Sequence, residues 1–215
     1  MKTIFCISGL GADERAFSKL NIPGYQLQVI PWLQPQAGES LQEYAARMRA
    51  GINENDPILM GLSFGGMVCI EIAKQVSVRR LILVSSIKSY KELPLWMKAV
   101  ARLKLNKIIP LRSNYTMTGF IQNHFLGIST TEEKALVAHS RQKANTQYIR
   151  WSVDKIVNWK NHWQPPAVIH IHGDKDRMFP VKKIAGPHII KNGGHFMIMN
   201  KAPEVSALIH HHLSA

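Results

Sequence analysis

Cysteine is scarce in this sequence, since Cys6 and Cys69 are the only two among 215 residues. Two thiols cannot build a disulfide framework or a zinc site of four thiolates, which excludes small disulfide-stapled and zinc-stapled folds. The count indicates an intracellular protein with free thiols. We expect both cysteines to pack as small apolar side chains.

Long apolar runs are absent as well. No stretch approaches the roughly 20 apolar residues that span a bilayer. The first apolar run is broken by Ser8 and Gly9 before it reaches the length of a signal sequence, so the expected location is the cytoplasm. A hydrophobic content of 46% with 19% charged residues excludes a disordered chain, a collagen-like fibre and a coiled coil. The length fits one domain, with or without an insertion.

Acidic residues are few, because 14 Asp and Glu stand against 27 Lys and Arg, for a net charge of +13. Such an excess is typical of proteins that meet nucleic acid, an anionic membrane or an acidic partner. The charge is unevenly distributed, and residues 87–165 alone carry 13 basic and 4 acidic side chains. The kind of partner that the excess of basic side chains indicates therefore depends on the role of residues 87–165.

Apolar runs alternate with helical patterns along the chain, in the order expected of βαβ units. The predicted strands cover residues 2–8, 25–31, 57–62, 79–85, 167–172 and 187–190. Several of these runs are almost wholly apolar, which is typical of strands buried on both faces of a parallel sheet. The strand over 25–31 alternates polar and apolar residues and ends at Pro31, so we place it at a sheet edge.

Helices are expected on both faces of this sheet. Ser40 and Glu43 form a capping box ahead of one amphipathic helix, and a last helix begins near Pro203. The predicted fold class is α/β, with a mostly parallel sheet of roughly six strands flanked by helices.

The segment 87–165 separates the fourth and fifth predicted strands and shows helical patterns only. Thr130 and Glu133 form another capping box within it. A connection of this length is unusual and often functional, so we predict a helical cap inserted between core segments 1–86 and 166–215. Residues 95–105 are expected to form a basic amphipathic helix whose apolar face lines an acyl pocket. The alternative is a docking surface for an acidic acyl carrier protein or an anionic membrane.

Residues 61–65 read Gly-Leu-Ser-Phe-Gly, a G-x-S-x-G motif between an apolar strand and a helical pattern. In that context Ser63 occupies a sharp turn with a strained backbone. Side chains at Gly61 and Gly65 would collide with neighbouring backbone, so only very small residues fit there. The following helix directs its N-terminal amides toward a developing anion. Ser63 is therefore the candidate nucleophile.

With this motif the chain resembles the α/β-hydrolase superfamily, in its esterase-like form with a serine nucleophile. The family's acid follows a late strand, and Asp176 occupies that position, while Asp174 is interpreted as a turn residue. The family's histidine follows the last strand, as His195 does here. The chain order of Ser63, Asp176 and His195 is the order that the family uses. Compared with the family's usual sheet, the first two strands are missing.

The resemblance also implies an oxyanion hole made of two backbone amides. One belongs to Phe64, directly after the nucleophile, and the other to Leu10 in the loop after the first strand. That loop resembles the family's His-Gly-x-Gly, with Ser8 in place of the histidine. The replacement concerns the hydrogen bonds that support the loop more than the amides themselves.

The implied chemistry is acyl transfer to water, with His195 as general base and acid and Asp176 as its orienting partner. No cofactor and no metal are expected. The leading interpretation is a hydrolase that cleaves a small-molecule carboxylic ester. The close alternative is a thioesterase or esterase whose substrate is carried by an acyl carrier protein. A third hypothesis, from another class, is a non-catalytic binding module that uses the basic cap.

A metal site is the alternative interpretation of His170, His172 and Asp174, which resemble the H-x-H-x-D motif of metallo-β-lactamases. The histidine that should follow directly is Lys175, so structural roles for these side chains are favoured. Nucleic acid is the least favoured partner, since no recognition motif accompanies the positive charge.

Overall fold

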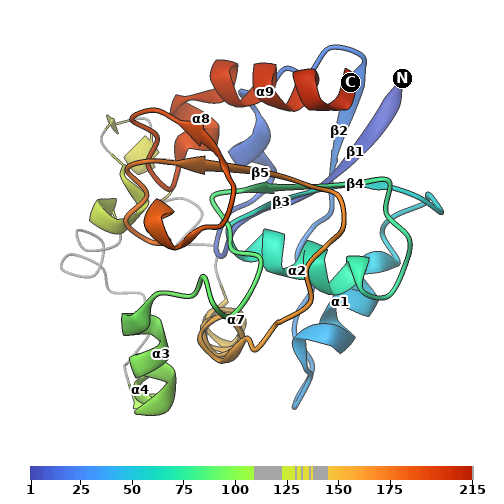
Figure 1. Ribbon diagram of the computed structural model, residues 1–215. Coiled ribbons are helices and arrows are strands. Elements are labelled where there is room, and N and C mark those ends of the chain that lie inside the picture. The colour runs from blue at the N-terminus through green and yellow to red at the C-terminus, as the bar shows by residue number, and fades with distance from the viewer. Residues whose placement is uncertain (109–122, 129, 132, 136, 138–144, 215) are drawn as a thin grey trace.

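The computed structural model describes residues 1–108, 123–128, 130–131, 133–135, 137 and 145–214 (Figure 1). Its centre is a six-stranded sheet in the order β2-β1-β3-β4-β5-β6. The strands are β1 (Lys2–Ile7), β2 (Tyr25–Val29), β3 (Ile58–Leu62), β4 (Arg80–Val84), β5 (Val168–Gly173) and β6 (His188–Ile190). All five pairings are parallel, and the predicted strands are confirmed to within two residues at their ends.

The burial of each strand follows its sequence pattern. β3 is buried at every position, whereas β2 alternates half-buried and exposed residues at the edge of the sheet, as predicted. On β1, Phe5 and Ile7 join one hydrophobic cluster while Ile4 and Cys6 join the other, because successive side chains point to opposite faces. The sheet therefore separates two cores.

Helices cover both of these cores. The helical elements are η1 (Glu14–Phe17), α1 (Leu41–Arg49), α2 (Phe64–Ala73), α3 (Leu95–Arg102), α4 (Leu105–Ile108), α7 (Thr146–Asn158), η2 (Val181–Lys183), α8 (Met197–Asn200) and α9 (Ala202–Ser214). Figure 1 shows α1 and α2 against one face of the sheet and α8 and α9 against the other. The capping boxes at Ser40 and at Thr130 are both confirmed, with backbone and side-chain bonds exchanged in each direction.

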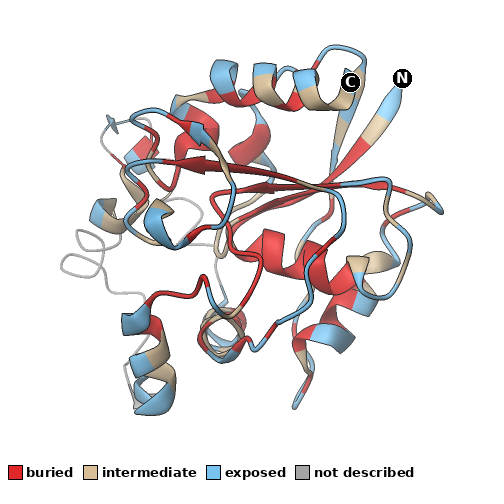
Figure 2. Ribbon diagram, viewed as in Figure 1, coloured by how far each residue is buried: buried red, intermediate tan, exposed pale blue. Residues whose placement is uncertain are grey.

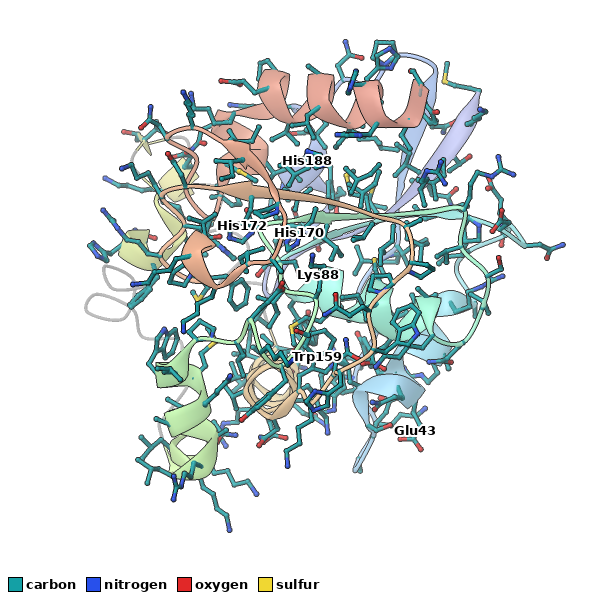
Figure 3. All side chains as sticks on the ribbon, viewed as in Figure 1. Glu43, Lys88, Trp159, His170, His172 and His188 are labelled. Carbon is teal, nitrogen blue, oxygen red and sulfur yellow. The ribbon has the colours of Figure 1, made fainter. Side chains whose placement is uncertain are left out.

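The chain between β4 and β5 includes α3, α4 and α7. α7 and the residues after it are tied to the α1/α2 side of the sheet by two indole hydrogen bonds. Trp151 Nε1 donates to the carbonyl of Glu39 over 3.0 Å, and Trp159 Nε1 donates to buried Glu71 Oε1 over 2.7 Å. Figure 3 labels Trp159 at this junction.

Residues 95–105 differ from the prediction in two ways. The helix ends at Arg102, and Lys104 has φ +54°, so α3 and α4 are separate helices. Leu95, Trp96 and Leu103 have exposed fractions of 68%, 45% and 62%, and Met97 is the buried residue of α3. Part of the apolar surface of residues 95–105 is therefore exposed, and Figure 2 colours much of this part of the chain as exposed or intermediate.

Both cysteines lie in the core, as expected. Burial raises the pKa of the Cys6 and Cys69 thiols, so both stay protonated and unreactive at neutral pH. Across the described helices, none is both long and apolar enough to cross a membrane.

Candidate active site

Ser63 occupies the sharp turn between β3 and α2, at the carboxyl edge of the sheet. Its backbone has φ +51° and ψ −118°, which non-glycine residues rarely adopt. Two bonds hold it there: the Ser63 N–H donates to the carbonyl of Val84 over 3.0 Å, and the Ser86 hydroxyl donates to the carbonyl of Ser63 over 2.7 Å. The end of the neighbouring strand β4 and the residues after it therefore maintain this strained backbone.

The glycines around Ser63 are required by close backbone packing. A Cβ atom on Gly65 would lie 2.2 Å from the carbonyl oxygen of Ile7, and one on Gly61 would lie 2.4 Å from the backbone of α2. This confirms that side chains at the two motif positions would collide with backbone. The same holds at Gly173, where a Cβ would lie 2.1 Å from the carbonyl oxygen of Gly193. That contact brings together the loops that carry Asp176 and His195.

Ser63, His195 and Asp176 form one continuous chain of hydrogen bonds. His195 Nε2 lies 2.9 Å from Ser63 Oγ, and His195 Nδ1 lies 2.8 Å from Asp176 Oδ2. His195 and Asp176 are both buried, whereas Asp174 is exposed and lies outside this chain of bonds. The three predicted side chains thus meet in the geometry of a nucleophile, a base and an orienting acid.

Asp176 is held as a carboxylate by three donors. Besides His195, its Oδ1 accepts the N–H of Phe179 over 2.8 Å, and its Oδ2 lies 3.3 Å from His172 Nε2. Burial disfavours the charged form, but the charge of His195 and the hydrogen bonds from His172 and His195 outweigh it. The pKa of Asp176 consequently lies well below its usual range.

The sequence did not identify His172 as a neighbour of the acid. Its Nε2 lies 2.7 Å from the carbonyl oxygen of Phe179, which only accepts, so this nitrogen carries the proton and shares it between that carbonyl and the more distant Asp176 Oδ2. The signal is its place on β5, four residues before Asp176, whereas the sequence pattern favours a structural role for His172 without indicating its partner.

The H-x-H-x-D motif does not converge on one point. His170 Nε2 bonds to the carbonyl of Ser86 over 3.0 Å, and burial lowers the pKa of His170 to about 3, so this side chain is neutral at pH 7. Figure 3 labels His170 and His172 inside the molecule, whereas Asp174 is exposed. In the parts of the chain that the structure covers, no three His, Cys, Asp or Glu side chains are grouped to hold a metal ion.

The loop after β1 passes directly beside Ser63. A Cβ on Gly9 would lie 3.4 Å from Ser63 Cβ, and the Ala12 N–H donates to the carbonyl of Gly9 over 3.0 Å to close the turn. Phe64 is the first residue of α2, where amides have no partner within the helix. Both predicted amide donors, those of Leu10 and Phe64, therefore belong to segments next to the nucleophile.

Aromatic side chains from three segments pack beside Phe64. The Trp32 ring stacks on the Phe64 ring, with centroids 5.4 Å apart and 10° between planes, and Tyr148 of α7 lies 5.4 Å from Trp32. The sequence did not identify Trp32 as part of the site, because it lies in a loop after an edge strand. A separate cavity of about 760 Å³ is lined by Asp176, Gly194 and several basic residues, but not by Ser63.

Comparisons with known proteins identify the family and the fold of the chain. The alpha/beta hydrolase family model matches residues 20–208. An esterase from Exiguobacterium antarcticum aligns with a TM-score of 0.73 and 14% identity, over 100% of this chain and 92% of its own. A thermophilic esterase from Thermogutta terrifontis aligns with a TM-score of 0.70 and 15% identity, over 100% of this chain and 90% of its own. The Bacillus megaterium epoxide hydrolase aligns with a TM-score of 0.71 and 10% identity, over 100% of this chain and 94% of its own.

No curated protein matches the sequence. At these low identities the solved structures show a shared fold, and the family model independently covers most of the chain. The chain belongs to the α/β-hydrolase family.

Proposed function

We propose that this protein is a serine hydrolase that cleaves a carboxylic ester through an acyl-enzyme intermediate. The observation that carries the proposal is the unbroken chain of bonds from Ser63 Oγ through His195 to Asp176. Ser63 Oγ attacks the carbonyl carbon while His195 Nε2 takes its proton, and His195 returns that proton to the leaving alcohol. Water then attacks the acyl-enzyme, gives its proton to His195, and releases the acid and free Ser63.

The negative charge that forms on the carbonyl oxygen is assigned to the amides of Leu10 and Phe64. Each such donor stabilises the transition state by about 2.7–4 kcal/mol. Support comes from the loop after β1, which adjoins Ser63, and from the position of Phe64 at the first turn of α2.

The segment 87–165 is proposed as a cap on the core formed by 1–86 and 166–215. Support comes from α7, whose Ile149 side chain would lie 3.8 Å from a Cβ on Gly11 in the loop after β1. Tyr148 of the same helix packs on Trp32 beside Phe64. The acyl group would then meet aromatic surface contributed by α7.

A panel of nitrophenyl esters and acyl thioesters tests the proposed reaction. We expect turnover of at least one ester and labelling of Ser63 by a fluorophosphonate, located by peptide mass spectrometry. A correctly folded protein that neither reacts with the probe nor turns over any member of the panel would contradict the proposal. Binding of liposomes or oligonucleotides by that inactive protein would instead favour a non-catalytic module.

A carrier-linked acyl substrate is the second candidate, favoured by the surface of α3 and α4. Arg102, Lys104 and Lys107 are exposed there beside exposed Leu103, and the residues of these two helices include no acid. The same panel of substrates distinguishes this candidate from a hydrolase of small-molecule esters. If it holds, the kcat/KM for an acyl-carrier thioester exceeds that for the free thioester and falls with salt, since the attraction is electrostatic.

Loss of the His172 donor is expected to weaken catalysis mainly at low pH. His172→Phe removes a hydrogen bond that lowers the pKa of Asp176, so the carboxylate becomes more basic and favours the protonated form of His195, which cannot accept the Ser63 proton. We expect kcat about 10-fold lower, KM nearly unchanged, and the acidic limb of the pH–rate profile moved to higher pH. His172→Gln, which keeps an N–H donor, should restore part of kcat and part of the wild-type position of the acidic limb.

His170→Phe is the matched control, because His170 lies on the same strand and bonds to Ser86 instead of Asp176. We expect that variant to change stability without moving the acidic limb. If the acidic limb of the pH–rate profile of His172→Phe stays where it is in the wild type, His172 has no role in the mechanism.

A further inference from the structure

The loop that holds the proposed oxyanion amide of Leu10 is supported by a chain of two side-chain hydrogen bonds. The hydroxyl of Ser8, at the start of the loop, donates to the carbonyl of Ala12 at its end over 2.7 Å. The same oxygen accepts the indole N–H of Trp32 over 2.9 Å. Ser8 is 1% exposed, so water does not compete for these bonds. The two bonds clamp both ends of the loop to Trp32.

Trp32 is itself held firmly by its neighbours. Tyr44 on α1 donates its hydroxyl to the carbonyl of Leu33 over 2.7 Å and accepts the Leu33 N–H over 3.0 Å. The Trp32 ring lies 6.2 Å from the Tyr44 ring at an angle of 30°. The residue after Trp32 is thereby fixed to α1, and the indole has little freedom to turn.

The same indole contacts both sides of the proposed oxyanion hole. Its N–H bonds to Ser8 in the loop after β1, and its ring stacks nearly parallel on Phe64, the residue after the nucleophile. One rigid side chain thus spans the two segments that supply the amides of Leu10 and Phe64. Oxyanion donors stabilise charge only when they are fixed in place before the reaction.

We propose that Trp32 is a positioning residue that sets the spacing of the two oxyanion amides. Ser8 links Trp32 to the loop, because its hydroxyl bonds to both the indole and the carbonyl of Ala12. The indole N–H occupies one acceptor site of the Ser8 oxygen and leaves the hydroxyl proton directed at Ala12. Ser8 stands where related loops carry histidine, and Trp32 from a different segment supplies the missing support. The inference rests on the proposed hydrolase function.

A double-mutant cycle on Trp32 and Ser8 tests this inference. Trp32→Phe keeps an aromatic ring for stacking on Phe64 but removes the N–H donor, and Ser8→Ala removes the relay. We expect each single variant to lower kcat for a nitrophenyl ester by about 10-fold to 100-fold, because a misplacement near 1 Å has an effect of that size. KM should stay within about threefold. The double variant should be no slower than the slower single variant, since both interrupt one chain.

Trp159→Phe is the matched control. It also removes a buried indole N–H bond, here to Glu71, but that bond lies outside the loop after β1. We expect this variant to lose folding stability, measured by urea unfolding, while kcat per folded molecule stays within about twofold of the wild type.

Failure of the inference and failure of the proposed function give different results. If the wild type turns over esters and is labelled at Ser63, but Trp32→Phe and Ser8→Ala keep full kcat per folded molecule, only the positioning role is overturned. Losses that multiply in the double variant overturn it as well. If the wild type neither turns over nor reacts with the fluorophosphonate, the proposed function itself fails.

Discussion

Ser63→Ala is expected to lower kcat for any ester that the protein hydrolyses by about 10⁶-fold, with KM changed by no more than about threefold. Alanine keeps the volume of the site but has no oxygen to attack the carbonyl carbon. His195 then has no proton to accept in the first step, although the oxyanion amides and the acyl site remain. Steady-state kinetics with a nitrophenyl ester measure the effect, and fluorophosphonate labelling should disappear with it.

Ser85→Ala provides the control for this substitution. Ser85 follows the neighbouring strand β4 and shares a positive φ with Ser63, +48° against +51°, although Ser85 is buried and Ser63 half-buried. Its hydroxyl has no hydrogen-bond partner among the residues that the structure describes. We expect this variant to retain turnover and labelling. Residual turnover of Ser63→Ala within about 10-fold of the wild type would show that another group is the nucleophile.

Gly65→Ala is expected to have the largest effect on stability. The new Cβ would lie 2.2 Å from the carbonyl oxygen of Ile7 and 2.3 Å from that of Ser8, and backbone atoms cannot turn aside as side chains do. Either β1 or α2 must shift. We expect the free energy of unfolding to fall by more than about 3 kcal/mol, beyond the usual range for overpacking. Urea unfolding followed by circular dichroism measures the change.

Gly38→Ala separates this steric effect from the conformational freedom of glycine. Gly38 has φ +74°, but a Cβ added to it would have no atom of the described residues within 4 Å apart from its own chain neighbours. Alanine there carries only the penalty for a left-handed backbone, roughly 1–2 kcal/mol. If Gly65→Ala were no more destabilising than Gly38→Ala, the close approach of α2 to β1 would not be the reason for glycine in the motif.

The sheet was predictable because its strands carry simple patterns. The continuous burial of β3 specifies a position in the centre of a parallel sheet. The polar alternation of β2 specifies a position at its edge. Ser63, Asp176 and His195 were found for a related reason. Ser63 directly follows a strand, whereas Asp176 and His195 lie in glycine-containing loops a few residues after strands. The ends of parallel strands bring such positions to one edge of the sheet.

What the sequence left unpredicted depends on contacts between distant segments. Trp32 and Ser8 are 24 residues apart, and no periodic pattern reports a hydrogen bond between two loops. The outward apolar surface of α3 was missed because helical spacing shows that a helix has two faces, without showing which one meets the core. Leu95 and Leu103 fit either orientation, and only packing decides between them.

The hydrogen bond between His195 and Ser63 joins residues 132 positions apart in the chain. Every pairing in the sheet is parallel, so each new strand docks only after a crossover has been formed and its loop-closure entropy has been overcome. Ser63 belongs to the middle of the sheet, whereas Asp176 and His195 follow the two strands at one side. The complete hydrogen-bonded chain therefore reports on the whole topology, and half of the sheet can assemble during folding without creating any reactive serine.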